Sequence, residues 1–176
     1  MSKKIKIFLG TFLGITAIFM ILGMVNRSIT MTDRIHVQRP VKEVFEATIV
    51  PLEIKEWLPN LQEVKPVHGS MDAPGNQFMV RARIGRKLLS FLMDVEDLQV
   101  EEKVAVFMRL PHMDGRVTIQ YHESGTGTEV VVQATIAGKG VFRRSLLIVL
   151  WPELKHRMVT SLESLKSYVE SDHTGE

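Results

Sequence analysis

The hydrophobic pattern of the chain begins with an unbroken uncharged stretch from Ile7 to Val25, which ends at the polar pair Asn26–Arg27. In a helix that rises 1.5 Å per residue, its roughly 19 residues extend about 28 Å, close to the roughly 30 Å hydrocarbon core of a bilayer. A single segment can pair all of its backbone amides in hydrocarbon only as a helix. The stretch therefore predicts one membrane-spanning anchor within residues 1–28. Its candidate anchor side chains are Ile7, Phe8, Phe12, Ile15, Phe19 and Leu22.

A cleaved signal peptide is the alternative reading of this segment. The apolar run is longer than the 7 to 15 residues usual for a signal core, and residues 20–26 lack an Ala-x-Ala-like cleavage site. An uncleaved single-pass anchor is therefore favoured. Lys3, Lys4 and Lys6 favour a cytoplasmic N-terminus and an extracytoplasmic domain, although basic residues also follow the segment. Gly10 and Gly14 have the spacing of membrane-helix dimers, but this short pattern leaves the oligomeric state open.

After the anchor, the hydrophobic pattern changes between the period of a strand and the period of a helix. Apolar and polar residues alternate from Ile29 to Val37, which predicts a first strand. Helical spacing then predicts a short helix from Pro40 to Pro51 and a second over Leu52–Leu58, which closes at Pro59–Asn60. A second strand is expected before the break at His68.

Five further strands are predicted, and together they form an antiparallel meander. The turn signals that separate them lie at Asp72–Gly75, Gly85–Arg86, Glu101–Glu102, Pro111–Gly115 and Ser124–Gly127. In the first of these strands, the alternate residues Phe78, Val80, Ala82 and Ile84 share one apolar face. The residues between them are largely polar, so each strand is expected to have one face in water.

The last third changes to a helical period. After Pro152, apolar residues recur every three or four positions up to Val169, which predicts a long amphipathic helix from Pro152 to Glu170. The preceding segment, Val141–Trp151, is unusually apolar and too short to span a bilayer. It is either a buried packing segment, the favoured reading, or a membrane-docking element in which Arg143 and Arg144 meet lipid phosphates.

These elements predict an α+β fold for a single domain at residues 29–176. A seven-stranded antiparallel sheet, with two short helices after its first strand, wraps around the long C-terminal helix. Such a sheet cannot contact the helix everywhere, so an apolar cavity is expected between them. The length of 176 residues leaves no room for a second domain.

Composition and charge exclude several kinds of chemistry. The 22 basic and 20 acidic residues give a net charge of +2, too near balance for a nucleic-acid-binding protein. Without cysteine, the chain has no disulfide, thiolate metal site or thiol nucleophile. The six histidines lack the spacing of a helical zinc site, and no serine lies in a Gly-x-Ser-x-Gly elbow. We expect no metal and no other cofactor, and no catalytic residue can be named.

Three arginines on the meander strands, Arg81, Arg83 and Arg109, are candidates for pairing with an anionic group of a ligand. Arg81 and Arg83 alternate with Met79 opposite the apolar face of their strand. Exposure to solvent is therefore the favoured reading for both.

Five sequence segments at the joints of these elements resemble the START-like or SRPBCC superfamily, which includes polyketide cyclases and lipid-transfer domains. They are Ile35–Phe45, Trp57–Pro59, Gly75–Phe78, Gly125–Val130 and Leu162–Glu170. The resemblance covers about residues 30 to 170, and it rests on the order of the segments rather than on any one of them. It implies a helix-grip fold whose cavity holds a lipid, isoprenoid, sterol or polyketide-like molecule. The membrane anchor lies outside the family pattern.

The resulting hypothesis is a membrane-anchored carrier or sensor that binds a hydrophobic small molecule or lipid. An enzyme of the cyclase or dehydrase kind and a protein-interaction module are the alternatives, and binding is favoured over catalysis. Converging polar groups would indicate the enzyme, and a filled core the interaction module. Core packing is the more common role for each candidate cavity residue. These candidates are Phe78, Val80, Phe91, Met93, Val117, Ile119, Tyr121, Val132, Leu154, Met158 and Leu162.

Overall fold

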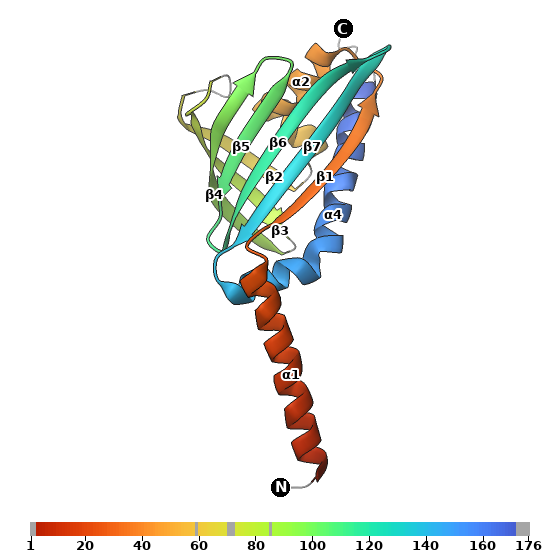
Figure 1. Cartoon of the computed structure of the whole chain (residues 1–176). Coiled ribbons are helices and arrows are strands. Elements are labelled where there is room, and N and C mark those ends of the chain that lie inside the picture. The colour runs from red at the N-terminus through yellow and green to blue at the C-terminus, as the bar shows by residue number, and fades with distance from the viewer. Residues whose placement is uncertain (1–2, 59, 70–72, 85, 172–176) are drawn as a thin grey trace.

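A computed structural model describes residues 3–58, 60–69, 73–84 and 86–171. Pro59, Asp72 and Gly85, which the sequence analysis places in turns, lie outside the described residues. Figure 1 shows an N-terminal helix that leads into a curved sheet, with the remaining helices along one side of the sheet. The helix-grip fold predicted from the sequence is confirmed.

The first helix, α1 (Lys3–Val25), carries the apolar stretch and extends away from the sheet (Figure 1). It is long and apolar enough to span a membrane, and among the described residues no other helix meets both conditions. Five of its six predicted anchor side chains are exposed, and the sixth, Phe19, is half-buried near the domain. Residues 26–28 alone connect α1 to the first strand of the sheet.

The sheet contains seven strands, all paired antiparallel. Their order is β1-β7-β6-β5-β4-β3-β2. The first strand is thus one edge of the sheet, where it pairs with the last strand, and the second strand is the opposite edge. The strand period and the turn signals predicted these elements, except that the turn expected at Pro111–Gly115 is shorter, because the sixth strand already begins at Met113, where it pairs with the seventh. The strands are β1 (Ile29–Val37), β2 (Leu61–His68), β3 (Gln77–Ile84), β4 (Lys87–Gln99), β5 (Lys103–Arg109), β6 (Met113–Ser124) and β7 (Gly127–Gly138).

Two short helices, α2 (Val41–Ile49) and α3 (Pro51–Trp57), follow β1 as predicted. Pro40 immediately precedes α2, and Pro51 is the first residue of α3. Proline is tolerated at a helix start because its missing N–H would lack a helical partner there. Pro40 therefore marks the start of α2, and Pro51 separates α2 from α3, which meet at Val50.

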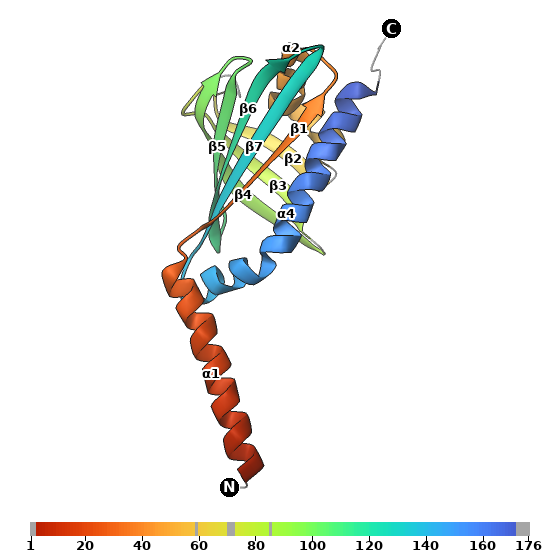
Figure 2. The same cartoon turned by 45° about the vertical axis from the view of Figure 1, so that its right-hand side comes forward.

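The C-terminal helix, α4 (Val141–Glu170), corrects one boundary of the sequence analysis. It begins eleven residues before Pro152, where the helix was expected to start, and Pro152 lies inside it. An internal proline removes one backbone hydrogen bond and clashes with the carbonyl four residues earlier, which bends a helix when both parts are held by packing. Figure 2 shows the first part of α4 crossing the end of α1 and the remainder turning along the sheet.

The hydrophobic core is formed by the inner face of the sheet and the helices that cover it. In the larger cluster, Leu162 of α4 and Phe45 of α2 pack against Tyr121, Val130 and neighbouring strand residues. A second cluster joins Phe78, Val80 and Val95 on β3 and β4. The alternation predicted for β3 is confirmed, because Phe78 and Val80 are buried while Met79 and Arg81 are exposed.

The end of α1 packs closely against the start of α4. The Ser145 hydroxyl, fully buried, donates to the backbone carbonyl of Phe19. The rings of Phe19 and Phe142 meet edge to face at 5.5 Å between centroids. Gly23 lies so close to Val141 and Ser145 that a Cβ atom there would collide with both. The α1 helix is therefore packed onto the domain by specific contacts as well as by the chain connection.

Candidate ligand cavity

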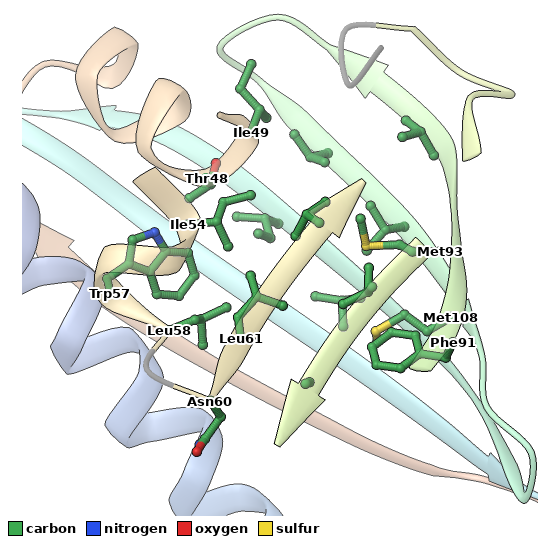
Figure 3. A pocket seen from close by; sticks show the side chains of 18 residues that line it. Thr48, Ile49, Ile54, Trp57, Leu58, Asn60, Leu61, Phe91, Met93 and Met108 are labelled. Atoms are coloured by element: carbon green, nitrogen blue, oxygen red, sulfur yellow. The ribbon is translucent and has the colours of Figure 1, made fainter. Parts of the chain in front are cut away.

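A cavity of about 310 Å³ lies between the inner face of the sheet and the helices α2 and α3. Figure 3 shows side chains from both sides converging on it. The sheet side is formed by Leu61, Val64, Val80, Ala82, Phe91, Met93, Val95, Val104, Val106, Met108, Val117 and Ile119. The helix side and the segment that follows it contribute Thr48, Ile49, Ile54, Trp57, Leu58 and Asn60.

The period of the strands positions the sheet side of the cavity. Side chains two residues apart on a strand point to the same face. Thus β4 contributes Phe91, Met93 and Val95, and β3, β5 and β6 repeat this spacing. The intervening residues face outward. On β2 the lining residues Leu61 and Val64 are three apart, because the register of that strand shifts after Leu61.

Helices α2 and α3 form the opposite wall, and Trp57 is its largest side chain. The indole Nε1–H donates to the backbone carbonyl of Ala47 at 2.8 Å, which holds the ring between the two helices. Its polar edge is therefore satisfied, and its apolar surface remains available to the cavity (Figure 3).

The cavity wall has very few polar atoms. Thr48 and Asn60 are the polar lining side chains apart from the Trp57 indole. The Thr48 hydroxyl donates to the carbonyl of Phe45 at 2.8 Å and pairs with the Tyr121 hydroxyl. Because the single hydroxyl hydrogen of Thr48 is used at Phe45, the Tyr121 hydroxyl must donate to Thr48. Burial raises the pKa of Tyr121 well above its ordinary value of 10.0, so this hydroxyl stays protonated.

Charged residues lie on the outer face of the sheet instead. Arg116 binds Glu96 through two hydrogen bonds of 2.6 and 2.9 Å, and Arg109 pairs with Asp94 at 2.6 Å. Arg81 pairs with Glu63 at 3.4 Å and is exposed, and Arg83 is also exposed. The predicted exposure of Arg81 and Arg83 is confirmed, and none of the three candidate arginines lines the cavity. Among the described lining residues there is no Asp, Glu, His, Lys or Arg.

The structure places the eleven candidate cavity residues in two groups. Val80, Phe91, Met93, Val117 and Ile119 line the cavity. Phe78, Tyr121, Val132, Met158 and Leu162 lie in the packed core, and Leu154 is half-buried on α4. No residue of α4 is among the described lining residues. The wall opposite the sheet is thus α2 and α3, where the sequence analysis expected the C-terminal helix.

Among the described lining residues, those that sequence analysis missed lie on both walls, six on the helical side and seven on the sheet. Ile49, Ile54 and Trp57 are apolar residues on short helices and Leu58 follows the second of them, a pattern that ordinary core packing also produces. On the sheet, the missed Val104, Val106 and Met108 alternate along β5. This alternation was available as a signal for the strand face, although not for the cavity itself.

A family model described as polyketide cyclase / dehydrase and lipid transport matches residues 28–170. The chain belongs to this family. The START-like resemblance drawn from five short segments is thereby confirmed. The match to this family model begins one residue before β1 and ends at the last residue of α4. Helix α1 therefore lies outside it.

Solved structures share the fold of the family domain. The crystal structure of Ara h 8.0201 has a TM-score of 0.68 and 17% identity, with 82% of this chain and 99% of that chain covered. TTHA0849 from Thermus thermophilus has a TM-score of 0.66 and 17% identity, over 80% of this chain and 97% of that one. The di-domain ARO/CYC BexL from the BE-7585A biosynthetic pathway has a TM-score of 0.65 and 15% identity, with 82% of this chain and 51% of that chain covered. The comparison with curated proteins found no match.

Proposed function

We propose that the protein is a membrane-anchored binding domain, a carrier or sensor, that holds a hydrophobic small molecule or lipid in the cavity. The observation that carries this proposal is the apolar lining of the 310 Å³ cavity. Its volume lies at the lower end of the range of small-molecule sites, about 300–1,000 Å³. Since an apolar surface gains free energy when water leaves it, such a lining favours an apolar ligand.

The contact between α1 and α4 supports an uncleaved anchor over a cleaved signal sequence. Gly23 and the hydrogen bond from Ser145 fit α1 closely to the domain. A segment that is removed after export has no need for such a fit. The lysines at residues 3, 4 and 6 favour a cytoplasmic N-terminus, so the proposed location of the domain is extracytoplasmic.

The position of the cavity also fits a ligand supplied by the bilayer. Met108 pairs with Gly115, and Gly115 pairs with Ile136, two residues before the end of β7. At about 3.3 Å per strand residue, one end of the cavity lies roughly 7 Å along the strands from the point where β7 ends. The start of α4 and the end of α1 lie at this same end of the sheet (Figure 1).

Replacing Ala82 with phenylalanine tests the proposed site. Ala82 lines the cavity on β3, so a ring at this position occupies the space of a ligand. The full chain is purified in detergent as wild type and as Ala82→Phe, and the apolar molecules that copurify are compared by mass spectrometry. We expect a ligand that is present in the wild type and strongly depleted in Ala82→Phe.

Met79→Phe is the matched control. Met79 lies on the same strand and is exposed on the outer face of the sheet, so its replacement adds a ring outside the cavity. Lipids that surround α1 copurify equally with all three proteins and cancel in the comparison. If Ala82→Phe folds and retains the same molecules as Met79→Phe, the cavity is not their binding site and the proposal is wrong.

The cyclase or dehydrase alternative has one feature in its favour, the hydroxyl pair of Thr48 and Tyr121 at the helix wall. Proton transfer in catalysis uses groups whose pKa lies near the working pH, and the raised pKa of Tyr121 moves it away from this range. Binding is therefore the better supported function. The interaction-module alternative expects a filled core, whereas a cavity lies between the sheet and the α2–α3 wall.

A further inference from the structure

The first part of α4 carries an apolar stripe that no described element of the domain covers. Its four members are exposed: Phe142 by 62%, Leu146 by 40%, Val149 by 60% and Leu150 by 41%. Their spacing of four, three and one places them on one side of the helix. Ser145 and Leu147 are buried on other sides of the same segment and hold it to the protein. The stripe is thus fixed in position while its apolar surface remains open.

This stripe is continuous with the apolar surface of α1. The ring of Phe142 contacts the ring of Phe19, which belongs to the membrane-spanning candidate. Figures 1 and 2 both show the first part of α4 running across the end of α1 rather than along it. With α1 across a bilayer, this segment therefore lies at the level where α1 leaves the hydrocarbon.

The charges beside the stripe suit lipid headgroups. Arg143 and Arg144 donate to the backbone carbonyls of Lys139 and Gly138, each at 3.1 Å. Within the described part of the chain, neither guanidinium forms an ion pair with a carboxylate. Each has donors left for phosphate oxygens, the anions that a membrane surface presents.

The end of the segment has the composition of a membrane interface as well. Trp151 is 38% exposed, and the ammonium group of Lys155 lies 5.5 Å from the centre of its ring. Tryptophan and lysine side chains combine an apolar body with a polar end, which suits the boundary between hydrocarbon and water. The acidic Glu153 that follows is paired with Arg157 at 2.8 Å.

We propose that Val141–Trp151 is an interfacial helix that docks on the bilayer in which α1 is anchored. Phe142, Leu146, Val149 and Leu150 enter the headgroup–acyl boundary, while Arg143 and Arg144 bind lipid phosphates. The inference rests on the anchor role of α1 in the proposed function. Its consequence is a second attachment point, which fixes the orientation of the sheet and of the cavity toward the membrane.

Depth-dependent fluorescence quenching in the full chain tests this docking. The sequence contains no cysteine, so a single introduced cysteine can carry an environment-sensitive fluorophore. Val149→Cys places it on the stripe, and Leu146→Cys gives a second position if the first variant folds poorly. Each protein is reconstituted into phosphatidylcholine–phosphatidylglycerol vesicles that contain lipids spin-labelled near the headgroup. We expect severalfold stronger quenching at residue 149 than at a position in water.

Val100→Cys is the matched control for a position in water. Val100 is also an exposed valine, and it lies in the β4–β5 turn at the opposite end of the sheet. Ile15→Cys in α1 reports on the anchor itself and is expected to be quenched by deeply labelled lipids. If residue 15 is quenched while residues 149 and 100 respond alike, docking is wrong and the anchor stands. If residue 15 is not quenched, the anchor and the docking both fail.

Discussion

At the scale of single residues, Thr48 shows how a polar group is accommodated beside an apolar cavity. Its side chain bonds to the carbonyl of Phe45 and to the hydroxyl of Tyr121, and both side chains are buried. A buried hydroxyl without a partner costs free energy, whereas a hydrogen-bonded one contributes about 0.5–1.5 kcal/mol to stability. The pair thus allows Tyr121 to fill the core next to the cavity with its hydroxyl satisfied.

Thr48→Val is therefore expected to lower the free energy of unfolding by about 1–3 kcal/mol, because it leaves the buried Tyr121 hydroxyl without its partner. Tyr121→Phe should lower the free energy of unfolding by less than Thr48→Val does, since Thr48 keeps its hydrogen bond to the carbonyl of Phe45. In the double variant both partners are absent, so the loss should be smaller than the sum of the two single losses. Denaturant unfolding of the four proteins measures these values, and strictly additive losses would contradict the role assigned to the pair.

Alkaline pH should destabilise the folded chain through its two tyrosines. Burial raises the pKa of Tyr121, and burial together with the charges of Glu53 and Glu56 raises that of Tyr168. Above the ordinary pKa of 10.0, an unfolded tyrosine loses its proton while the folded one retains it. The unfolded state then binds fewer protons, so stability falls as the pH rises past 10.0. Denaturant midpoints measured across this pH window should fall less steeply in Tyr121→Phe than in the wild type.

Residue alternation predicted part of the cavity and could not predict the rest. Val80, Phe91 and Val117 were expected to face inward from the period of their strands, and they line the cavity. Phe78 obeys the same period and belongs to the same buried cluster as Val80, yet it does not line the cavity. Both positions are apolar and inward, so only the distance to the opposing wall separates a lining residue from a core residue. That distance is a tertiary property, which a period along one strand does not contain.

At the scale of elements, the join between α1 and α4 depends on a small residue. Gly23 has the Val141 carbonyl oxygen and the Ser145 hydroxyl where its Cβ would be, whereas Gly14 in the same helix has no atom within 4 Å of that position. The sequence analysis considered Gly10 and Gly14 for helix packing and did not consider Gly23. Sequence spacing marks pairs of small residues, but the position of Gly23 against another element is visible only in the fold.

Gly23→Ala should therefore lower the thermal unfolding midpoint, because the added methyl group forces α1 and α4 apart at a cost of about 1–3 kcal/mol. Gly14→Ala is the matched control, and the higher helix propensity of alanine should leave its midpoint unchanged or slightly raised. Both variants are compared with the wild type in the same detergent. Equal midpoints for the two variants would show that the α1–α4 contact does not stabilise the protein.

The start of α4 was predicted at Pro152, eleven residues too late, because of the proline itself. Proline followed by helical spacing is typical of a helix start, and Pro152 fits that rule. Instead, the apolar segment before it forms the first part of the helix, and its polar residues are three neighbours, Arg143, Arg144 and Ser145, which show no helical period. Packing of Ser145 and Leu147 holds this part in place, and this packing involves elements far away in the sequence.

At the scale of the whole molecule, the sheet and its closing helix were predictable because their signals are local and repeated. The strand count, the antiparallel order and the two short helices all agree with the sequence analysis. The position of the cavity was not predictable, since it depends on how far α2, α3 and α4 each stand from the sheet. Leu162 of α4 is part of the packed core, whereas Ile54 and Trp57 of α3 line the cavity.

The short connection between α1 and β1 restricts what an anchored carrier can do. It comprises only residues 26–28, and three extended residues reach at most about 11 Å. With α1 embedded, the domain has no tether on which to travel, and it cannot shuttle its cargo through water to a distant compartment. Any molecule that it passes on must therefore be collected at the same membrane, by an acceptor that diffuses to the domain.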